Sequence, residues 1–249
     1  MVKVVRPHLV GDRHSLRRLA AEARFVERLT HPVIVRGFGA VLDGPRPHLV
    51  LEHLEGPRLS RLVRKHGPLG QEQLVPLALQ LASAVHYLAE ERVVHLDVKP
   101  SNVIMGAVPR LIDLSIARET EGIERVTHRI GTAGYMAPEQ CEPGLHGPLG
   151  PAADVWGMGA TLHHAASGRA PFPKPPRGAE GAEAYPQSTQ PPLPLPPSVP
   201  APIAALIGAC LERDPAARPA PAEVHARLER LASGLPTKPV LARFRIRPR

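Results

Sequence analysis

The sequence predicts an α+β fold with a small β-rich first part and a mainly helical second part. Up to about residue 55 many apolar residues fall in short strand-like runs bounded by turn residues. After the turn at residues 55–57 they recur mainly at helical spacing. With 249 residues, of which 43% are apolar and 22% charged, the chain can bury the core of one large domain or of two small lobes.

In the first part, one helix and three short strands are predicted. The helix, at residues 12–29, has apolar residues at the i, i+3, i+4 and i+7 spacing of a half-buried helix. Glu22 interrupts this stripe one turn from Leu19 and Val26. We expect its carboxylate to face the packed side and to need a cationic partner there, unless it reaches solvent at the stripe edge. The strands are expected at residues 2–5, 33–42 and 48–54, with a turn at 43–45.

The second part is predicted to be helical apart from one hairpin and a proline-rich segment. Because proline breaks helix interiors and lacks a backbone donor, residues 171–202 are expected to form an irregular surface insertion. Helices are expected at residues 71–91, 153–167, 202–213 and 221–233, hairpin strands at 103–105 and 111–113, and a basic tail at 234–249.

Composition excludes several classes of protein. The formal net charge of +8 permits anionic partners, but only 3% of residues are aromatic, so the stacking that single-stranded nucleic acids need is not expected. No run approaches the roughly 18 apolar residues of a membrane-spanning helix, and the N-terminus lacks a secretory pattern. Two cysteines are too few for a disulfide framework or a four-cysteine zinc site. We therefore expect a cytoplasmic chain with two free thiols and no transmembrane segment.

One loop concentrates residues that could act on a phosphate. Asp97 is followed by Lys99 and Asn102, and Asp113 comes eleven residues after that Asn. Together these side chains could present a base, a cation and metal-binding oxygens to one phosphate group. Each residue alone would be an ordinary loop residue, so the prediction depends on their joint spacing.

With four further segments, this loop resembles the eukaryotic-type serine/threonine protein kinase family, and the resemblance runs from about Lys3 to Leu231. It predicts a bilobal, protein-kinase-like fold with a mainly helical C-lobe. The matching segments are residues 95–102 (catalytic loop), 113–115 (metal-binding motif), 131–139 (end of the activation segment), 154–159 (start of the central C-lobe helix) and 213–219 (late arginine motif).

The resemblance implies catalytic roles for five side chains. Asp97 is expected to be the base that accepts the proton of a substrate hydroxyl, and Lys99 to neutralise charge on the transferred phosphoryl group. Thr132 is expected to contact both and to favour Ser/Thr over Tyr substrates. Asn102 and Asp113 are the expected ligands of Mg²⁺ or Mn²⁺ bridging the phosphates of ATP.

The resemblance also implies a nucleotide site in the first part. Lys3 is expected to hold the α- and β-phosphates and to be the cationic partner that Glu22 needs. Leu51 is expected beside the adenine, with hinge hydrogen bonds from the backbone of Glu52 to Leu54.

Structural roles follow from the same comparison. Glu139 and Arg218 are expected to form a buried ion pair between the activation segment and the C-lobe. Asp154 is expected to cap its helix and to bond the backbone of the catalytic loop.

The sequence departs from the family in three places. The Gly-rich loop and two strands that precede the strand lysine are missing before Lys3, so residues 1–55 are expected to form a partial N-lobe and residues 56–233 the C-lobe. Either translation starts upstream of Met1, or the kinase is degraded. Leu96 replaces an arginine that, in many members of the family, contacts the phosphate group of a phosphorylated activation loop. Ser115 replaces a glycine, and this substitution restricts the backbone at that position.

The leading hypothesis is a protein kinase that transfers the γ-phosphoryl group of ATP to a protein Ser/Thr hydroxyl. A pseudokinase serving as a nucleotide-sensing or protein-binding scaffold is the alternative, because the Gly-rich loop is missing. A small-molecule kinase would share Asp97, Asn102 and Asp113, but Thr132 and the Glu139–Arg218 pair belong to a protein-substrate activation segment.

Overall fold

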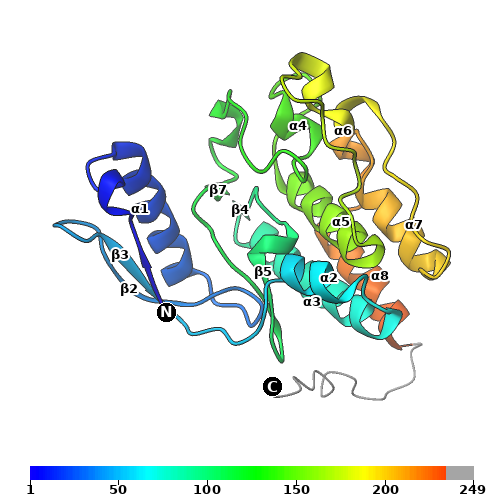
Figure 1. Cartoon of the computed structure of the whole chain (residues 1–249), viewed down its shortest axis with the longest axis horizontal. Helices are drawn as coiled ribbons and strands as arrows, with labels where there is room; N and C mark the ends of the chain where they lie inside the picture. Colours follow the sequence, from blue (N-terminus) through cyan, green and yellow to red (C-terminus); the bar gives the residue numbers. More distant parts are fainter. Residues whose placement is uncertain (234–249) are drawn as a thin grey trace.

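A computed structural model of the chain describes residues 1–233, and the predicted basic tail lies outside the described residues. It confirms the α+β fold: small antiparallel sheets accompany a mainly helical remainder. Figure 1 shows the first sheet and α1 at one end and the main helices at the other. No helix within residues 1–233 is long and apolar enough to span a membrane. The predicted division at residue 55 stays a prediction.

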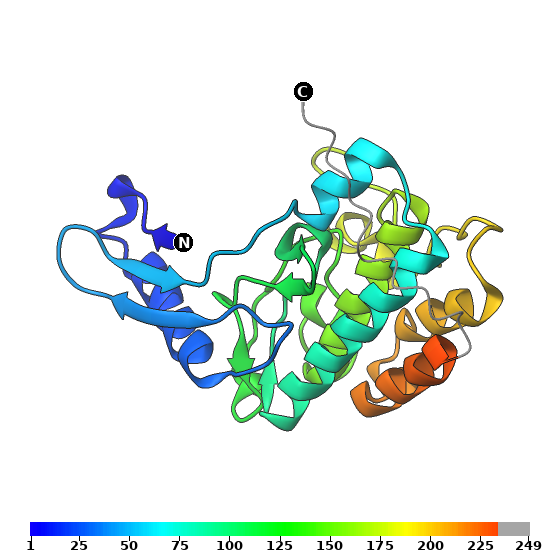
Figure 2. The same ribbon diagram turned by 90° about the horizontal axis from the view of Figure 1, so that it is seen from below.

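The first sheet contains β1 (Val2–Val4), β3 (His48–Leu51) and β2 (Gly37–Val41), in the spatial order β1-β3-β2. Lys3 pairs with Leu49, so both side chains point to the face that is covered by α1 (Arg13–Arg28). Figure 2 shows this helix lying along the sheet. The Asp12 carboxylate caps the helix by accepting from the amides of His14 and Ser15.

The strand predicted at 33–42 is shorter than expected, because β2 begins only at Gly37. The preceding segment pairs instead with β6 (Pro109–Leu111): Leu111 donates to the Val33 carbonyl at 2.6 Å, and Val35 donates to the Leu111 carbonyl at 3.0 Å. The strand predicted at 48–54 likewise ends at Leu51. These pairings fasten the chain between α1 and β2 to the hairpin that leads to the phosphate-site residues.

The helical part is built around α5 (Pro151–Ser167), whose side chains are buried on nearly every side. It packs against α3 (Gln71–Glu90), α7 (Ala201–Cys210) and α2 (Leu59–His66), and α3 also packs against α8 (Pro221–Ser233). A Cβ at Gly157 would lie 2.9 Å from the Val98 carbonyl oxygen. Glycine there lets α5 approach the catalytic loop closely.

Several predicted boundaries in this part were wrong. Helix α5 begins two residues before the predicted start and α7 ends three residues early, while α2 was not predicted. The second hairpin strand ends at Leu111 because Asp113 has φ 72°, which no strand accommodates. The remaining short elements are β4 (Val93–Val94), β5 (Val103–Met105), β7 (Arg118–Glu119), α4 (Pro138–Cys141), and the 3-10 turns Pro7–Leu9, Pro100–Asn102, Ile123–Arg125 and Pro215–Ala217.

The proline-rich segment is only partly the irregular surface insertion that was predicted. It contains a 3-10 turn (Gly181–Ala184) and the short helix α6 (Pro186–Thr189), whose Gln187 is buried. The Gln187 amide donates to the carbonyls of Ala133 (2.8 Å) and Met136 (3.2 Å). Burial of this side chain therefore ties the segment to residues 131–139, a tertiary contact that composition does not reveal.

The predicted buried ion pair between Glu139 and Arg218 is confirmed. Both side chains are fully buried, and the guanidinium donates to both carboxylate oxygens, at 2.6 and 2.8 Å. The guanidinium carbon lies 4.9 Å from the centroid of the Trp156 ring. The other donors of Arg218 reach the carbonyls of Ala152, Glu212 and Arg213. All the charge of this pair is thus compensated inside the core.

Replacing Arg218 by Met should lower the free energy of unfolding by about 3–5 kcal/mol, because Glu139 would remain buried without its counter-charge. Urea denaturation measures this. The matched control is Arg227→Met, which removes an exposed pair with Glu223 on α8 and should cost no more than about 0.5 kcal/mol. Equal losses in the two variants would contradict the prediction.

The two predicted free thiols, Cys141 and Cys210, are both buried, and burial raises the pKa of each to about 12. Because the thiolate is the reactive form, we expect almost no reaction with DTNB in the native protein at about pH 8. Two thiols should titrate once the chain is unfolded in guanidinium. Rapid labelling of the native protein would show that one of these sites opens.

Candidate active site

Three predicted site residues, Lys99, Asn102 and Thr132, converge on the Asp97 carboxylate. Lys99 Nζ donates to Asp97 Oδ2 at 2.6 Å, and the Asn102 amide donates to the same oxygen at 2.9 Å. Thr132 Oγ1 donates to Asp97 Oδ1 at 2.6 Å and accepts from Lys99 Nζ at 2.5 Å. Thr132 lies 35 residues after Asp97, so the loop after β7 folds back onto the segment after β4. The arrangement holds a carboxylate and an ammonium group at one point.

The loop carrying Asp97 is held in a strained conformation. Leu96 is buried and has φ 65°, a conformation that a bulky residue adopts only where surrounding contacts enforce it. The buried Asp154 carboxylate accepts from the amides of His95 (2.6 Å) and Leu96 (2.8 Å), and Gln140 donates to the Leu96 carbonyl at 2.8 Å. These hydrogen bonds fix the loop backbone and therefore the direction in which the Asp97 side chain projects from the loop.

Asp154 does not have the capping role that the sequence predicted. Helix α5 begins at Pro151 with Gly150 before it, so Asp154 lies inside the first turn and its carboxylate turns away to the loop. Burial raises the pKa of Asp154, against the opposing effect of its two backbone donors and of His95. Its predicted bond to the loop backbone is confirmed.

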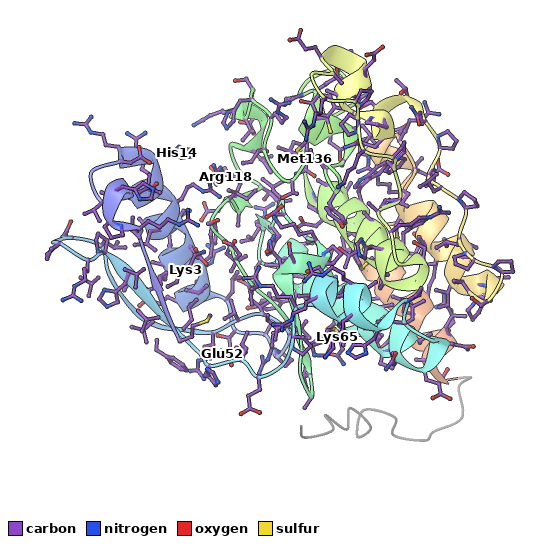
Figure 3. The ribbon with its side chains drawn as sticks, in the orientation of Figure 1. Lys3, His14, Glu52, Lys65, Arg118 and Met136 are labelled. Atoms are coloured by element: carbon purple, nitrogen blue, oxygen red, sulfur yellow. The ribbon has the colours of Figure 1, made fainter. Side chains whose placement is uncertain are left out.

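Lys3 joins the two halves of the predicted nucleotide site. Its ammonium lies 2.6 Å from Glu22 Oε2 and 2.9 Å from Asp113 Oδ1. In Figure 3 Lys3 lies on β1, close to α1. Glu22 is 1% exposed, and its other oxygen, Oε1, has no hydrogen-bond partner within the described residues. The cationic partner that the stripe on α1 required is therefore Lys3, and the expectation that Glu22 points inward is confirmed.

The charges of this cluster shift its titration. Burial alone would raise the pKa of Asp113, but Lys3 and a hydrogen bond from the Ser115 hydroxyl outweigh it and lower the pKa to about 2. Burial would likewise lower the pKa of Lys3, but Glu22 and Asp113 raise it. For Glu22, burial prevails and raises the pKa despite Lys3. Asp113 is thus an anion at neutral pH, as a metal ligand must be.

The oxygen atoms of Asn102 and Asp113 fit a hard divalent cation. The Asn102 amide nitrogen is used by Asp97, since it donates to both the Asp97 carbonyl and its carboxylate. The side-chain oxygen of Asn102, Oδ1, has no hydrogen bond within the described residues and is free for a cation. No cluster of three or more His, Cys, Asp or Glu side chains in residues 1–233 could hold a metal alone. A metal here would take its remaining ligands from phosphate and water.

The predicted adenine end of the site lies where the first sheet ends. Leu51 is buried at the end of β3 and pairs through its backbone with Met1. The Glu52 amide is already used, because it donates to the Arg36 carbonyl at 2.9 Å. The Leu54 amide makes no hydrogen bond within residues 1–233, so it can donate to a ligand. Of the predicted hinge groups, the Glu52 amide is therefore occupied by a backbone partner.

A cavity of about 280 Å³ opens beside Lys3, between β1, α1 and the segment after β6. Lys3, Glu22 and Asp113 line it together with Arg6, Arg18 and Ser115. Arg18 and Ser115 touch each other there, a contact that the sequence analysis missed. Arg18 lies four residues before Glu22 and therefore on the same face of the helix. This spacing was the feature of the sequence that could have indicated that Arg18 also faces the site.

The protein kinase domain profile matches residues 1–227 of this chain. The chain therefore belongs to the protein kinase family, and its relatives are bacterial Ser/Thr kinases. It is 33% identical over 241 residues to the serine/threonine-protein kinase PkaA of Streptomyces coelicolor, covering 94% of this chain and 43% of PkaA. It is 36% identical over 229 residues to PknK of Mycobacterium tuberculosis (89% and 20%) and 31% identical over 229 residues to PknA of the same species (87% and 51%). This chain thus spans about half of PknA and less of the other two.

Replacing Lys3 by Met should raise the pKa of Asp113 above its value of about 2, because the largest effect that opposes burial would be removed. The readout is the ¹³C chemical shift of the Asp113 carboxyl carbon followed from neutral to acid pH. Lys65→Met, on the exposed side of α2, is the matched control and should leave the titration unchanged. An unchanged midpoint in Lys3→Met would contradict the prediction.

The same shift has a consequence for stability. Because the folded pKa of Asp113 lies below 3.8, its ionisation stabilises the fold above that value, and this contribution is lost as the pH falls towards 2. Wild type and Lys3→Met should therefore differ most in unfolding free energy at neutral pH and converge in acid.

Proposed function

We propose that this chain is a protein kinase domain that transfers the γ-phosphoryl group of ATP to a Ser or Thr hydroxyl of a protein. The observation that carries the proposal is the hydrogen-bonded set of Asp97, Lys99 and Thr132. It places a carboxylate, an ammonium group and a hydroxyl within bonding distance of one another, next to metal-binding oxygens. Phosphoryl transfer needs such a set, since most of its catalysis is positioning and charge stabilisation.

In this proposal Asp97 orients the substrate hydroxyl and accepts its proton as the oxygen attacks phosphorus. Its Oδ1 atom accepts a hydrogen bond from Thr132, and its Oδ2 atom accepts hydrogen bonds from Lys99 and Asn102. The carboxylate therefore cannot rotate freely. Lys99 supplies positive charge where negative charge develops on the transferred group. A carboxylate that is fixed in this way abstracts a proton without having to reorganise.

ATP with Mg²⁺ or Mn²⁺ is the proposed cofactor. Lys3 would hold the α- and β-phosphates, Asn102 and Asp113 would hold the metal, and the backbone from Glu52 to Leu54 would face the adenine beside Leu51. When bound, the metal supplies charge neutralisation to the phosphate oxygens. The contacts of Lys3 with Glu22 and Asp113 support this assignment, because they bring the cation and the metal ligand to one place.

A protein substrate is favoured over a small molecule by the activation segment. The Glu139–Arg218 pair and Gln187 hold residues 131–139 in place, and Thr132 in that segment contacts Asp97 directly. The segment therefore presents an ordered surface next to the proposed base. A peptide could lie on it with its hydroxyl at Asp97.

Asp97→Asn should lower phosphate transfer by about 10²- to 10⁴-fold, because the proton acceptor is lost while the shape is kept. The assay is incorporation of labelled phosphate from ATP, with Mg²⁺ or Mn²⁺, into a generic basic protein. Asp43→Asn, in the exposed turn between β2 and β3, is the control and should transfer at the wild-type rate. Transfer that survives Asp97→Asn would refute this assignment. No transfer by any form would favour the scaffold hypothesis.

Thr132→Val should lower kcat by more than tenfold, whereas Thr132→Ser should retain most of it, since serine keeps the hydroxyl that bonds both Asp97 and Lys99. The comparison is made on Ser, Thr and Tyr forms of one peptide. Equal activity of the Val and Ser variants would show that the hydroxyl has no part in the reaction.

A further inference from the structure

Ser115 lies two residues after Asp113, and its buried side chain contacts α1. Only 8% of Ser115 is exposed. Arg18 Nη2 on α1 donates to its Oγ at 3.2 Å. Ser115 Oγ therefore accepts a hydrogen bond from α1 at a position two residues after Asp113. From the sequence, Ser115 was expected only to restrict the backbone, whereas its hydroxyl also contacts α1.

This contact is a second link between α1 and the segment that carries Asp113. Arg18 and Glu22 are one helical turn apart on α1, so they face the same way. Glu22 is tied to Asp113 through Lys3, and Arg18 is hydrogen-bonded to Ser115, two residues after Asp113. Both links line the cavity of about 280 Å³ beside Lys3. Helix α1 therefore contacts the segment after β6 at two points rather than one.

The second link differs from the first in what it restrains. The Lys3 link needs charge, which water and salt weaken, since Lys3 and Asp113 are each more than one third exposed. The Arg18–Ser115 link is a hydrogen bond that ends on a buried side chain, and it acts two residues from Asp113, whose φ is 72°. A restraint at this point keeps the Asp113 carboxylate from swinging out of the site.

We propose that Ser115 and Arg18 are positioning residues that hold the Asp113 carboxylate in the orientation needed to bind the metal–nucleotide complex. This inference rests on the proposed function, because it assigns Asp113 as a metal ligand. Neither residue touches the reacting atoms. Their effect should appear in the affinity for nucleotide with metal, and much less in the affinity for nucleotide alone.

The test uses the full chain and ADP, which binds without turnover. Calorimetry gives the Kd of ADP with Mg²⁺ and again in EDTA, and the Kd in EDTA divided by the Kd with Mg²⁺ measures the metal-dependent part of binding. Ser115→Ala and Arg18→Met should each reduce this ratio about three- to tenfold, and the double variant no further than the stronger single variant. Arg17→Met is the matched control, since Arg17 is the exposed neighbour of Arg18 on α1 and should keep the wild-type ratio.

A second measurement follows the free protein. Hydrogen exchange of the amides in residues 113–118 should quicken in Ser115→Ala and Arg18→Met but not in Arg17→Met. A merely structural role would change this exchange and leave the metal-dependent ratio as it is.

The outcomes separate this inference from the proposed kinase activity. Unchanged ratios, or strictly additive effects in the double variant, would overturn the inference even if the wild type is an active kinase. Wild type that binds Mg²⁺–ADP yet transfers no phosphate would refute the proposed function, while the ratios would still decide the role of Ser115. Absence of any metal-dependent ADP binding by the wild type would also overturn the inference.

Discussion

The Lys3 ammonium is the contact on which the arrangement of the site depends. It lies between a carboxylate of α1 and a carboxylate of the segment after β6, so one cation joins the first sheet, its helix and the helical part. Burying Glu22 would be costly without it, since a carboxylate that is 1% exposed needs a counter-charge. The position of α1 and the ionisation of Asp113 therefore follow from the same ion.

A different constraint acts at the other end of the site. The strained Leu96 backbone persists because Asp154 and Gln140 each satisfy backbone groups of the loop, and both are anchored in the helical core. Gly157 allows α5 to approach this loop, and Arg218 fixes the segment that carries Thr132 through Glu139. Rigid helices thus support the loop residues whose geometry the proposed reaction requires.

Much of the site could be predicted from sequence because its residues are close in the chain or have a recognisable spacing. Asp97, Lys99 and Asn102 lie within six residues, and the apolar stripe of α1 together with the family resemblance indicated that Glu22 faces inward towards Lys3. The contact between Arg18 and Ser115 could not be predicted, since it joins residues 97 positions apart. Strand ends were misplaced for a related reason: Val33 and Val35 suit a strand, but their partner is Leu111, whose position depends on the tertiary fold.

The sequence by itself determined the α+β class, the family and the identity of the candidate site residues, because these depend on periodicity and on motif spacing. Tertiary structure decided which groups contact one another and which hydrogen-bond donors and acceptors remain free. It redirected Asp154 from a helix cap to the loop backbone and brought Gln187 of the proline-rich segment against residues 131–139. The physical reason is that buried polar groups must find partners, and those partners are chosen by proximity in space rather than by order along the chain.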